Sequence, residues 1–450
     1  MATLDGSIAN TALPTIAREL HATPAESIWV VNGFQLAVTV SLLSFASLGD
    51  SRGISFVYRI GIIIFTIGSL LCALAHNLSF LIGARVLQGI GGAALMAIGP
   101  ALYREIFPQK DLGKALGLSA VIVATGAAAG PTVGGTLLHF TTWPWLFAIN
   151  VPLGIFDIFF SRSLPSTRGT HARLDLPSIV LSAVGFGAII YGIDGFARHE
   201  DLWIIASEVV IGLIAGVLFV QRSRRLADAA PLIAIDLFAN PTFSLASITS
   251  TATYVAQGLA YVSLPYFFQT ALGKSPFESG LLLSSWPLAV VVVAPIAGRL
   301  SDRYPAGILS TIGLAILALG LGLYATLPAH PSTVEILFHG MICGIGFGFF
   351  HSPNNRELVG SAPRNKTGSA AGILACARLT GQTVGAAAVA IVFGAVTATV
   401  TAGSTHAAAI VLAATPIALW AACSSATLAT IASASRLLIK RPQHKIAGAR

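Results

Sequence analysis

The sequence has 450 residues, of which 55% are hydrophobic and only 10% are charged, and its net charge is +8. Soluble domains contain roughly 25% charged residues, so this composition excludes an ordinary water-soluble protein. The charge shows no clustered basic face of the kind that binds nucleic acid, and no nucleic-acid partner is expected. The four cysteines lack metal-ligand spacing, and we expect no metal site.

Apolar segments of about 20 residues recur along the whole chain, and each is long enough to cross a hydrocarbon layer of roughly 30 Å. Thirteen such segments and a shorter one at the start of the chain, fourteen in all, predict an all-α integral membrane protein and exclude a β-barrel. In chain order they are Met1–Ala17, Ile28–Leu48, Phe56–Ala75, Leu78–Tyr103, Gly113–His139, Trp145–Arg162, Leu176–Phe196, Leu202–Gln221, Thr242–Phe268, Ser279–Gly298, Pro305–Leu327, Val334–His351, Thr367–Val400 and Thr405–Ser433.

The first segment is short for a membrane span. Asp5 lies roughly 13–18 Å from the outer end of this segment, which places the carboxylate near the membrane midplane with little helix on its inner side. We therefore expect the first helix to be truncated, with about ten apolar residues missing from its start.

Basic residues are distributed unevenly between the two sides of the predicted membrane. Of the 26 lysines and arginines, 21 fall in alternate loops on one side, and only Arg18, Arg198 and Lys274 fall on the other. Cytoplasmic loops carry the excess of basic residues, so both termini are predicted to face the cytoplasm. Arg85 and Arg378 lie inside spans.

Asp5 and Arg85 are charged residues within apolar segments. A charge in hydrocarbon costs at least about 2.5–3.5 kcal/mol and is retained mainly for function. Burial favours the neutral form of a carboxylic acid, so Asp5 is a candidate for binding and releasing a proton. Alternatively, it is a structural acid bonded to neighbouring helices. Arg85 keeps its proton and is a candidate partner for a carboxylate, in coupling or in a purely structural pair.

Glu208 and Arg378 are two further charges inside predicted spans. Glu208 lies in the second of two segments near the middle of the chain and is a weaker candidate for coupling or substrate binding. Arg378 lies close to the midplane, where it could pair with a carboxylate or line a cavity.

Small residues in the fifth segment follow a four-residue repeat. Gly126, Gly130 and Gly134 form a smooth stripe on which another helix can pack closely. Pro131 removes one backbone hydrogen bond and is expected to bend the helix.

Two cytoplasmic turns share a Gly-x-x-x-Asp-Arg pattern, complete in the second turn but with Ala46 and Ser51 in place of the glycine and the arginine in the first. Such a repeat is the weak internal symmetry of a transporter built from two related bundles. The turns read GDSRG at Gly49–Gly53 and GRLSDR at Gly298–Arg303. Six segments precede the pair Leu176–Phe196 and Leu202–Gln221, and six follow it, so the pair looks like an insertion between two halves.

With these features the chain resembles the major facilitator superfamily, in particular the fourteen-spanner drug:proton antiporters of the EmrB/QacA type. The motifs that carry the resemblance are LDGSIANTALP at Leu4–Pro14, LIGARVLQGIGG at Leu81–Gly92, GAAAGPTVGG at Gly126–Gly135 and WLFAINVPLG at Trp145–Gly154. The segments SPNN at Ser352–Asn355 and ARLTGQ at Ala377–Gln382 are most similar to the YebQ-type members.

The resemblance implies a major facilitator fold with two six-helix bundles plus two inserted helices. The expected domains are residues 1–163, the inserted pair with its linkers at 164–240, the second bundle at 241–435 and a basic cytoplasmic tail at 436–450. The resemblance also implies roles in gating and helix packing for Asp50, Arg52, Gly126, Gly130, Pro131, Gly134, Gly135, Gly298, Asp302 and Arg303. The first turn departs from the family at Ala46 and Ser51, which weakens the gating latch expected in the first half.

The predicted function is proton-coupled antiport that exports small amphipathic or cationic compounds, with Asp5 as the proton carrier and Arg85 as its partner. A major facilitator-type metabolite exporter or importer remains an alternative, and a membrane-embedded enzyme or sensor is a further one. The proton gradient would drive transport, so no cofactor is expected. The expected location is the bacterial cytoplasmic membrane, where the chain contacts lipid, substrate and protons as a possible monomer.

Aromatic and amide side chains in the predicted spans are candidates for the wall of a substrate cavity, because aromatic faces beside a central acid suit lipophilic cations. Equally, such residues occur on any buried helix. The candidates are Phe34, Gln35, Asn150, Gln257, Tyr261, Trp286 and Gln382.

The predicted orientation can be tested by labelling. In a background without the native cysteines, His199→Cys should react with an impermeant thiol reagent added to intact cells, whereas His171→Cys should react only once the membrane is opened. The reverse labelling pattern would contradict the orientation.

Overall fold

The computed structural model describes residues 1–165, 175–195, 200–226, 234–363, 366–400 and 407–438, and these residues contain no strand. His171 and His199 lie outside them. The long helices are α1 (Ala2–Glu19), α3 (Trp29–Arg52), α4 (Ile54–Ala73), α5 (Leu78–Ile106), α6 (Gln109–Phe140), α9 (Leu176–Gly195), α10 (Leu202–Arg225), α11 (Pro241–Tyr266), α12 (Pro276–Leu300), α13 (Ala306–Ala325), α14 (Thr333–Gly360), α15 (Thr367–Val400) and α16 (Ala407–Ser435). Shorter elements are α2 (Pro24–Ser27), α7 (Pro144–Ala148), α8 (Asn150–Phe160), η1 (Ser161–Ser163), η2 (Ile235–Ala239), η3 (Phe267–Ala271) and η5 (Arg436–Leu438).

Eleven of the described segments are long and apolar enough to cross a membrane. Helices α1, α6 and α11, with 18, 32 and 26 residues, are three further long helices outside that set. Within the described ranges, each of the fourteen predicted segments therefore corresponds to a helix or a helix pair. This all-helical architecture confirms the predicted fold class, because helices satisfy their backbone hydrogen bonds internally in lipid.

Two helices differ from their predicted spans. The segment predicted at Trp145–Arg162 is interrupted at Ile149, between α7 and α8. Helix α14 does not end at His351 but continues to Gly360, and Pro353 lies inside it. The extension is amphipathic, with Asn354 and Leu358 buried, so packing against neighbouring helices stabilises it beyond the apolar stretch.

Several helices begin with a hydrogen-bonded cap. In α2, α12 and α14 the residue before the helix is a serine or threonine whose hydroxyl accepts from the third backbone N–H, and a glutamate at that position returns the bond. Such capping boxes satisfy backbone donors that helix starts leave free. They fix where these helices begin after their connecting loops.

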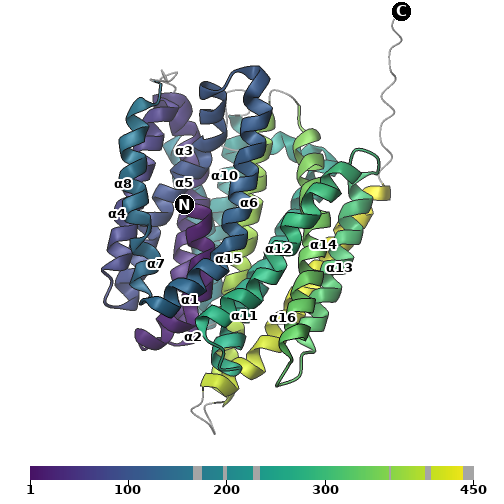
Figure 1. Ribbon diagram of the computed structural model, residues 1–450. Helices are drawn as coiled ribbons and strands as arrows, with labels where there is room; N and C mark the ends of the chain where they lie inside the picture. The colour runs from purple at the N-terminus through teal and green to yellow at the C-terminus, as the bar shows by residue number, and fades with distance from the viewer. Residues whose placement is uncertain (166–174, 196–199, 227–233, 364–365, 401–406, 439–450) are drawn as a thin grey trace, which may run out of the picture.

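The helices form two groups, which Figure 1 shows side by side: α1 to α8 in purple to blue, and α11 to α16 in green to yellow. The inserted helices α9 and α10 pack mainly on each other, and α9 also contacts α3 and α15, one helix from each group. The groups contact each other mainly through α6 with α12, α3 with α15 and α1 with α11. The domain boundaries given above remain a prediction.

Helix α6 uses its small residues on two faces. Gly130 and Gly134 lie against Ser7 and Ile8 of α1, within the first half. On another face, a Cβ added at Gly135 would come within 2.5 Å of the Pro276 carbonyl oxygen at the start of α12, in the second half. The stripe predicted from the sequence therefore packs α1, while Gly135 belongs to the contact between halves.

Side-chain hydrogen bonds join the two halves near the end of α11. Gln269 donates to the backbone oxygen of Thr11 in α1 at 2.8 Å, and the hydroxyls of Ser27 and Tyr266 bond to each other. Tyr266 is the last residue of α11 and Gln269 lies in η3 directly after it, and α6 and α12 diverge toward the opposite end in Figure 1.

Gly280 tests the contact between halves, because its added Cβ would overlap the carbonyl oxygen of Pro131 on α6. Gly280→Ala should therefore force α12 away from α6 and lower the melting temperature of the purified protein. The control is Gly216→Ala in α10, where no atom lies within 4 Å of the added Cβ. Equal melting temperatures for both variants would contradict this packing.

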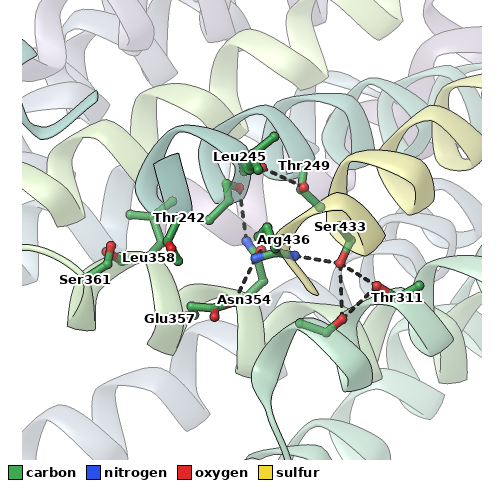
Figure 2. A network of polar contacts seen from close by, with 12 residues as sticks. Thr242, Leu245, Thr249, Thr311, Asn354, Glu357, Leu358, Ser361, Ser433 and Arg436 are labelled. Carbon is green, nitrogen blue, oxygen red and sulfur yellow. Dashed lines mark hydrogen bonds and ion pairs between the residues drawn. The ribbon is translucent and has the colours of Figure 1, made fainter. Parts of the chain in front are cut away.

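A buried guanidinium joins the end of the last helix to the rest of the second half (Figure 2). Arg436, in η5, is 6% exposed and donates from Nη1 to Asn354 at 2.8 Å and to Glu357 at 3.0 Å, both on α14. Its Nη2 donates to Ser433 at 2.7 Å, and Thr311 of α13 donates to the same serine oxygen.

Asn354 carries the connection further, since its amide donates to Ser250 of α11 at 2.8 Å. Four helices of the second half thus meet around one arginine that the sequence analysis had placed at the start of a basic tail.

Two arginine–carboxylate pairs of the second half allow a matched comparison. The side chains of Arg436 and Glu357 are 2% and 16% exposed, whereas those of Arg356 and Asp302 are 59% and 61% exposed. Breaking a buried pair costs up to about 3–5 kcal/mol, but an exposed pair contributes about 0–1 kcal/mol. Arg436→Met should therefore lower the melting temperature strongly and Arg356→Met only slightly. The opposite order would refute the assignment.

Candidate functional site

Asp5 and Arg85 form an ion pair inside the first half. Nη1 of Arg85 lies 2.5 Å from Oδ2 of Asp5, and their side chains are 0% and 1% exposed. Asp5 comes from α1 and Arg85 from α5, so the contact joins two helices far apart in the sequence. A pair so completely removed from solvent has a large desolvation cost, which only close geometry and further hydrogen bonds can offset.

Further donors supply those bonds. Oδ1 of Asp5 accepts from Asn150 at 2.7 Å and from Gln88 at 3.0 Å. Asn150 is the first residue of α8, directly after the break at Ile149, and Gln88 is one helical turn beyond Arg85. The carboxylate of Asp5 therefore accepts hydrogen bonds from three side chains, which stabilise its charged form.

Arg85 is fixed on several sides. Its Nε donates to the backbone oxygen of Val30 at 3.0 Å, and its Nη1 also bonds to Gln88 at 2.5 Å. The guanidinium carbon lies 4.2 Å from the ring centre of Phe34 and 5.3 Å from that of Phe147. Its Nη2 has no hydrogen-bond partner among the residues that the structure describes. Aromatic faces thus surround the cation where polar partners are few.

The network extends through α4, which the sequence analysis did not include. Gln88 donates to Ser69 at 2.8 Å and accepts a long contact of 3.7 Å from the thiol of Cys72. Gln88 had been quoted within the fourth-helix motif, and its spacing of three residues from Arg85 was the available signal, because such residues share a helix face.

A second cluster lies in the other half. Tyr261 contacts the edge of Trp286 at a ring-centre distance of 5.2 Å, and Trp286 contacts Phe347 at 6.4 Å. Gln382 donates to Gln257 at 3.1 Å between α15 and α11. Trp286 is 2% exposed and Gln257 is 8% exposed. Four of the predicted cavity residues therefore lie among α11, α12 and α15.

The remaining predicted cavity residues lie elsewhere. Phe34 and Asn150 belong to the ion-pair network of the first half. Gln35 accepts a bond of 3.3 Å from Thr383, which joins α3 to α15 across the two halves. The predicted set is thus divided among three places and does not form a single wall.

Neither of the two other candidate charges, Glu208 and Arg378, is among the described partners of the Asp5 carboxylate. Glu208 lies on α10 beside Gly192 of α9, outside both bundles. Arg378 is partly buried on α15, and no described residue forms a hydrogen bond or ion pair with it.

The expected gating residues differ between the halves. In the second half Asp302 pairs with Arg356, whose guanidinium also bonds to Ser301 at 3.1 Å. Gly298 lies against Ser352, and Arg303 is exposed. In the first half Arg52 is exposed at the end of α3, and the side chain of Asp50 falls outside the described part of the structure.

Comparison with known proteins identifies relatives over most of the chain. The chain is 49% identical over 394 residues to the uncharacterized transporter YebQ of Escherichia coli, covering 87% of this chain and 86% of that protein. It is 33% identical to the riboflavin transporter RibZ of Clostridioides difficile, covering 84% and 82%. It is 31% identical to the putative multidrug resistance protein MdtD of Salmonella typhi, covering 80% and 77%.

A solved structure shares the fold at low sequence identity. It is a bacterial homologue of the human lysosomal transporter Spinster in an inward-facing, unoccupied conformation, with a TM-score of 0.66 and 16% identity over 97% of this chain and 95% of that one. The Major Facilitator Superfamily pattern matches residues 1–219 and 246–445. The chain therefore belongs to the major facilitator superfamily and is a multi-pass membrane transporter, not an enzyme.

Proposed function

We propose that this transporter is a proton-coupled antiporter that exports small amphipathic compounds across the bacterial cytoplasmic membrane by alternating access. The observation that carries the proposal is the buried Asp5–Arg85 pair, in which one carboxylate accepts bonds from three side chains. A membrane-embedded ion pair without a solvent path is costly and is retained mainly for function.

Proton binding would change this pair directly. A protonated Asp5 is neutral and donates a hydrogen bond, so it no longer compensates the charge of Arg85. Arg85 cannot lose its proton, and it would be left as a buried charge held by Val30, Gln88 and aromatic faces. The pair therefore has two states of different stability, which is what coupling requires.

Helix α1 can transmit the change to the other half. It carries Asp5 in the first-half network and, six residues later, Thr11, whose backbone oxygen accepts from Gln269 at the junction of the halves. Gly130 and Gly134 of α6 pack closely on the same helix. A shift of α1 would therefore act on a contact between the two halves.

The direction and substrate type are supported by relatives. The name of MdtD, a putative multidrug resistance protein, favours export of varied compounds. The name of RibZ, a riboflavin transporter, favours the second candidate, which is a transporter of one metabolite. Both candidates use the same ion pair, and they differ in how many compounds compete for transport.

Asp5→Asn tests the coupling, because it keeps the size of the side chain but removes the titrating group. Uphill transport driven by a pH gradient in proteoliposomes should fall to background, while downhill exchange of substrate should persist. The matched control is Asp157→Asn on α8, another intramembrane carboxylate, which accepts from Tyr58 at 2.9 Å and lies outside the network. Full uphill transport by Asp5→Asn would show that the proton carrier is another residue.

A further inference from the structure

The charge of Asp5 is already compensated within the first half. Arg85 pairs with one carboxylate oxygen, and Asn150 and Gln88 donate to the other. The side chain is 1% exposed, so a substrate cation has no access to it in this conformation. The expectation of cationic substrates depended on a central acid that was free to receive them.

The charge of Arg378, in contrast, is not compensated by any described residue. It lies eleven residues into α15, roughly 17 Å from the start of that helix, and it is only partly buried. No described residue forms a hydrogen bond or ion pair with its guanidinium, although intramembrane charges normally have a partner. Gln382, one turn further along, shares its helix face.

An aromatic cluster lies beside the part of α15 that carries Arg378. Gly381, three residues beyond Arg378 on the same face of α15, lies against Tyr254 of α11, and Tyr254 contacts Phe347 of α14 at a ring-centre distance of 5.8 Å. His351 stacks on Phe347 with ring centres 5.7 Å apart, and Phe347 contacts Trp286 of α12. Three helices of the second half thus place rings in one cluster, and the fourth, α15, carries Arg378 one turn from the contact with Tyr254.

Trp286 provides an independent indication of a ligand. Its side chain is 2% exposed, and its indole N–H has no acceptor within the described ranges. An indole N–H can only donate, and a buried donor without a partner is destabilising. Two donors therefore lack acceptors within the same aromatic cluster, and a ligand with an acidic group would supply what both require.

We propose that Arg378, Trp286 and the neighbouring aromatic rings bind the transported compound, and that this compound is a planar aromatic molecule with a negative charge. This inference rests on the proposed function and specifies its substrate class. A guanidinium forms paired bonds with a carboxylate or sulfonate, and edges and faces of aromatic side chains accommodate a flat ring. A lipophilic cation would meet the same rings but would be repelled by Arg378.

Two dyes with the same ring system separate these possibilities. Fluorescein is an anionic xanthene and rhodamine 6G a cationic one, and their binding to the purified full-length protein in detergent can be measured by fluorescence anisotropy. The unmodified protein should bind fluorescein more tightly. Arg378→Gln should weaken fluorescein binding by about ten- to a hundredfold, as expected for the loss of a charge-assisted hydrogen bond.

Further variants separate the roles of charge and donor. Arg378→Lys should retain part of the affinity because it keeps the charge, and Trp286→Phe should weaken fluorescein binding by a smaller factor because it keeps a ring. Arg225→Gln, at the exposed end of α10, is the matched control and should bind as the unmodified protein does. Melting temperatures establish that each variant is folded.

The outcome is independent of proton coupling, because binding in detergent needs no gradient. Tighter binding of rhodamine 6G, equal affinity for the two dyes or no binding of either would overturn the inference. Fluorescein binding with no accompanying proton movement in proteoliposomes would instead overturn the proposed function and leave this inference standing.

Discussion

The structure of the first half is organised around one buried ion pair. Asp5 and Arg85 connect α1 to α5, and their partners extend the network to α3, α4 and α8. Such a pair gives little net stability, because desolvation of two charges offsets most of their attraction. In the proposed mechanism the pair matters because adding one proton to Asp5 would leave the charge of Arg85 uncompensated.

The packing between the two halves determines how a movement of α1 would reach the second half. Helix α6 packs on α1 through glycines and on α12 through Pro131 and Gly135, so backbone meets backbone on two sides. Close backbone packing is rigid, and movement of α1 cannot be absorbed by flexible side chains there. In the second half Arg436 joins four helices into one unit, so the halves are suited to move as bodies.

Much of the fold could be predicted from the sequence, because each helix that crosses the membrane needs an apolar segment of about 20 residues. The position of Asp5 and Arg85 inside apolar segments also made them candidates for a functional role. Their contact, and the bonds from Gln88 and Asn150, depend on how α1, α5 and α8 pack, which no local pattern encodes. Residue roles at this site remain predictions.

Other features escaped prediction for identifiable reasons. Arg436 follows the last predicted span, Thr405–Ser433, and stands at the start of the basic tail, so nothing local distinguishes it from a loop arginine, yet it is buried by α14. The aromatic and amide residues were grouped as one cavity wall because composition carries no information about depth or facing. Packing assigns Phe34 to the ion pair, Gln35 to the contact between halves and Trp286 to the second half.

The central claim is that Asp5 is the group that takes up and releases the proton. Infrared difference spectroscopy of the protein in lipid, recorded between high and low pH, detects the C=O stretch of a newly protonated carboxylic acid. The account predicts such a band in the unmodified protein, its loss in Asp5→Asn and its persistence in Asp157→Asn. An unchanged band in Asp5→Asn would contradict the account.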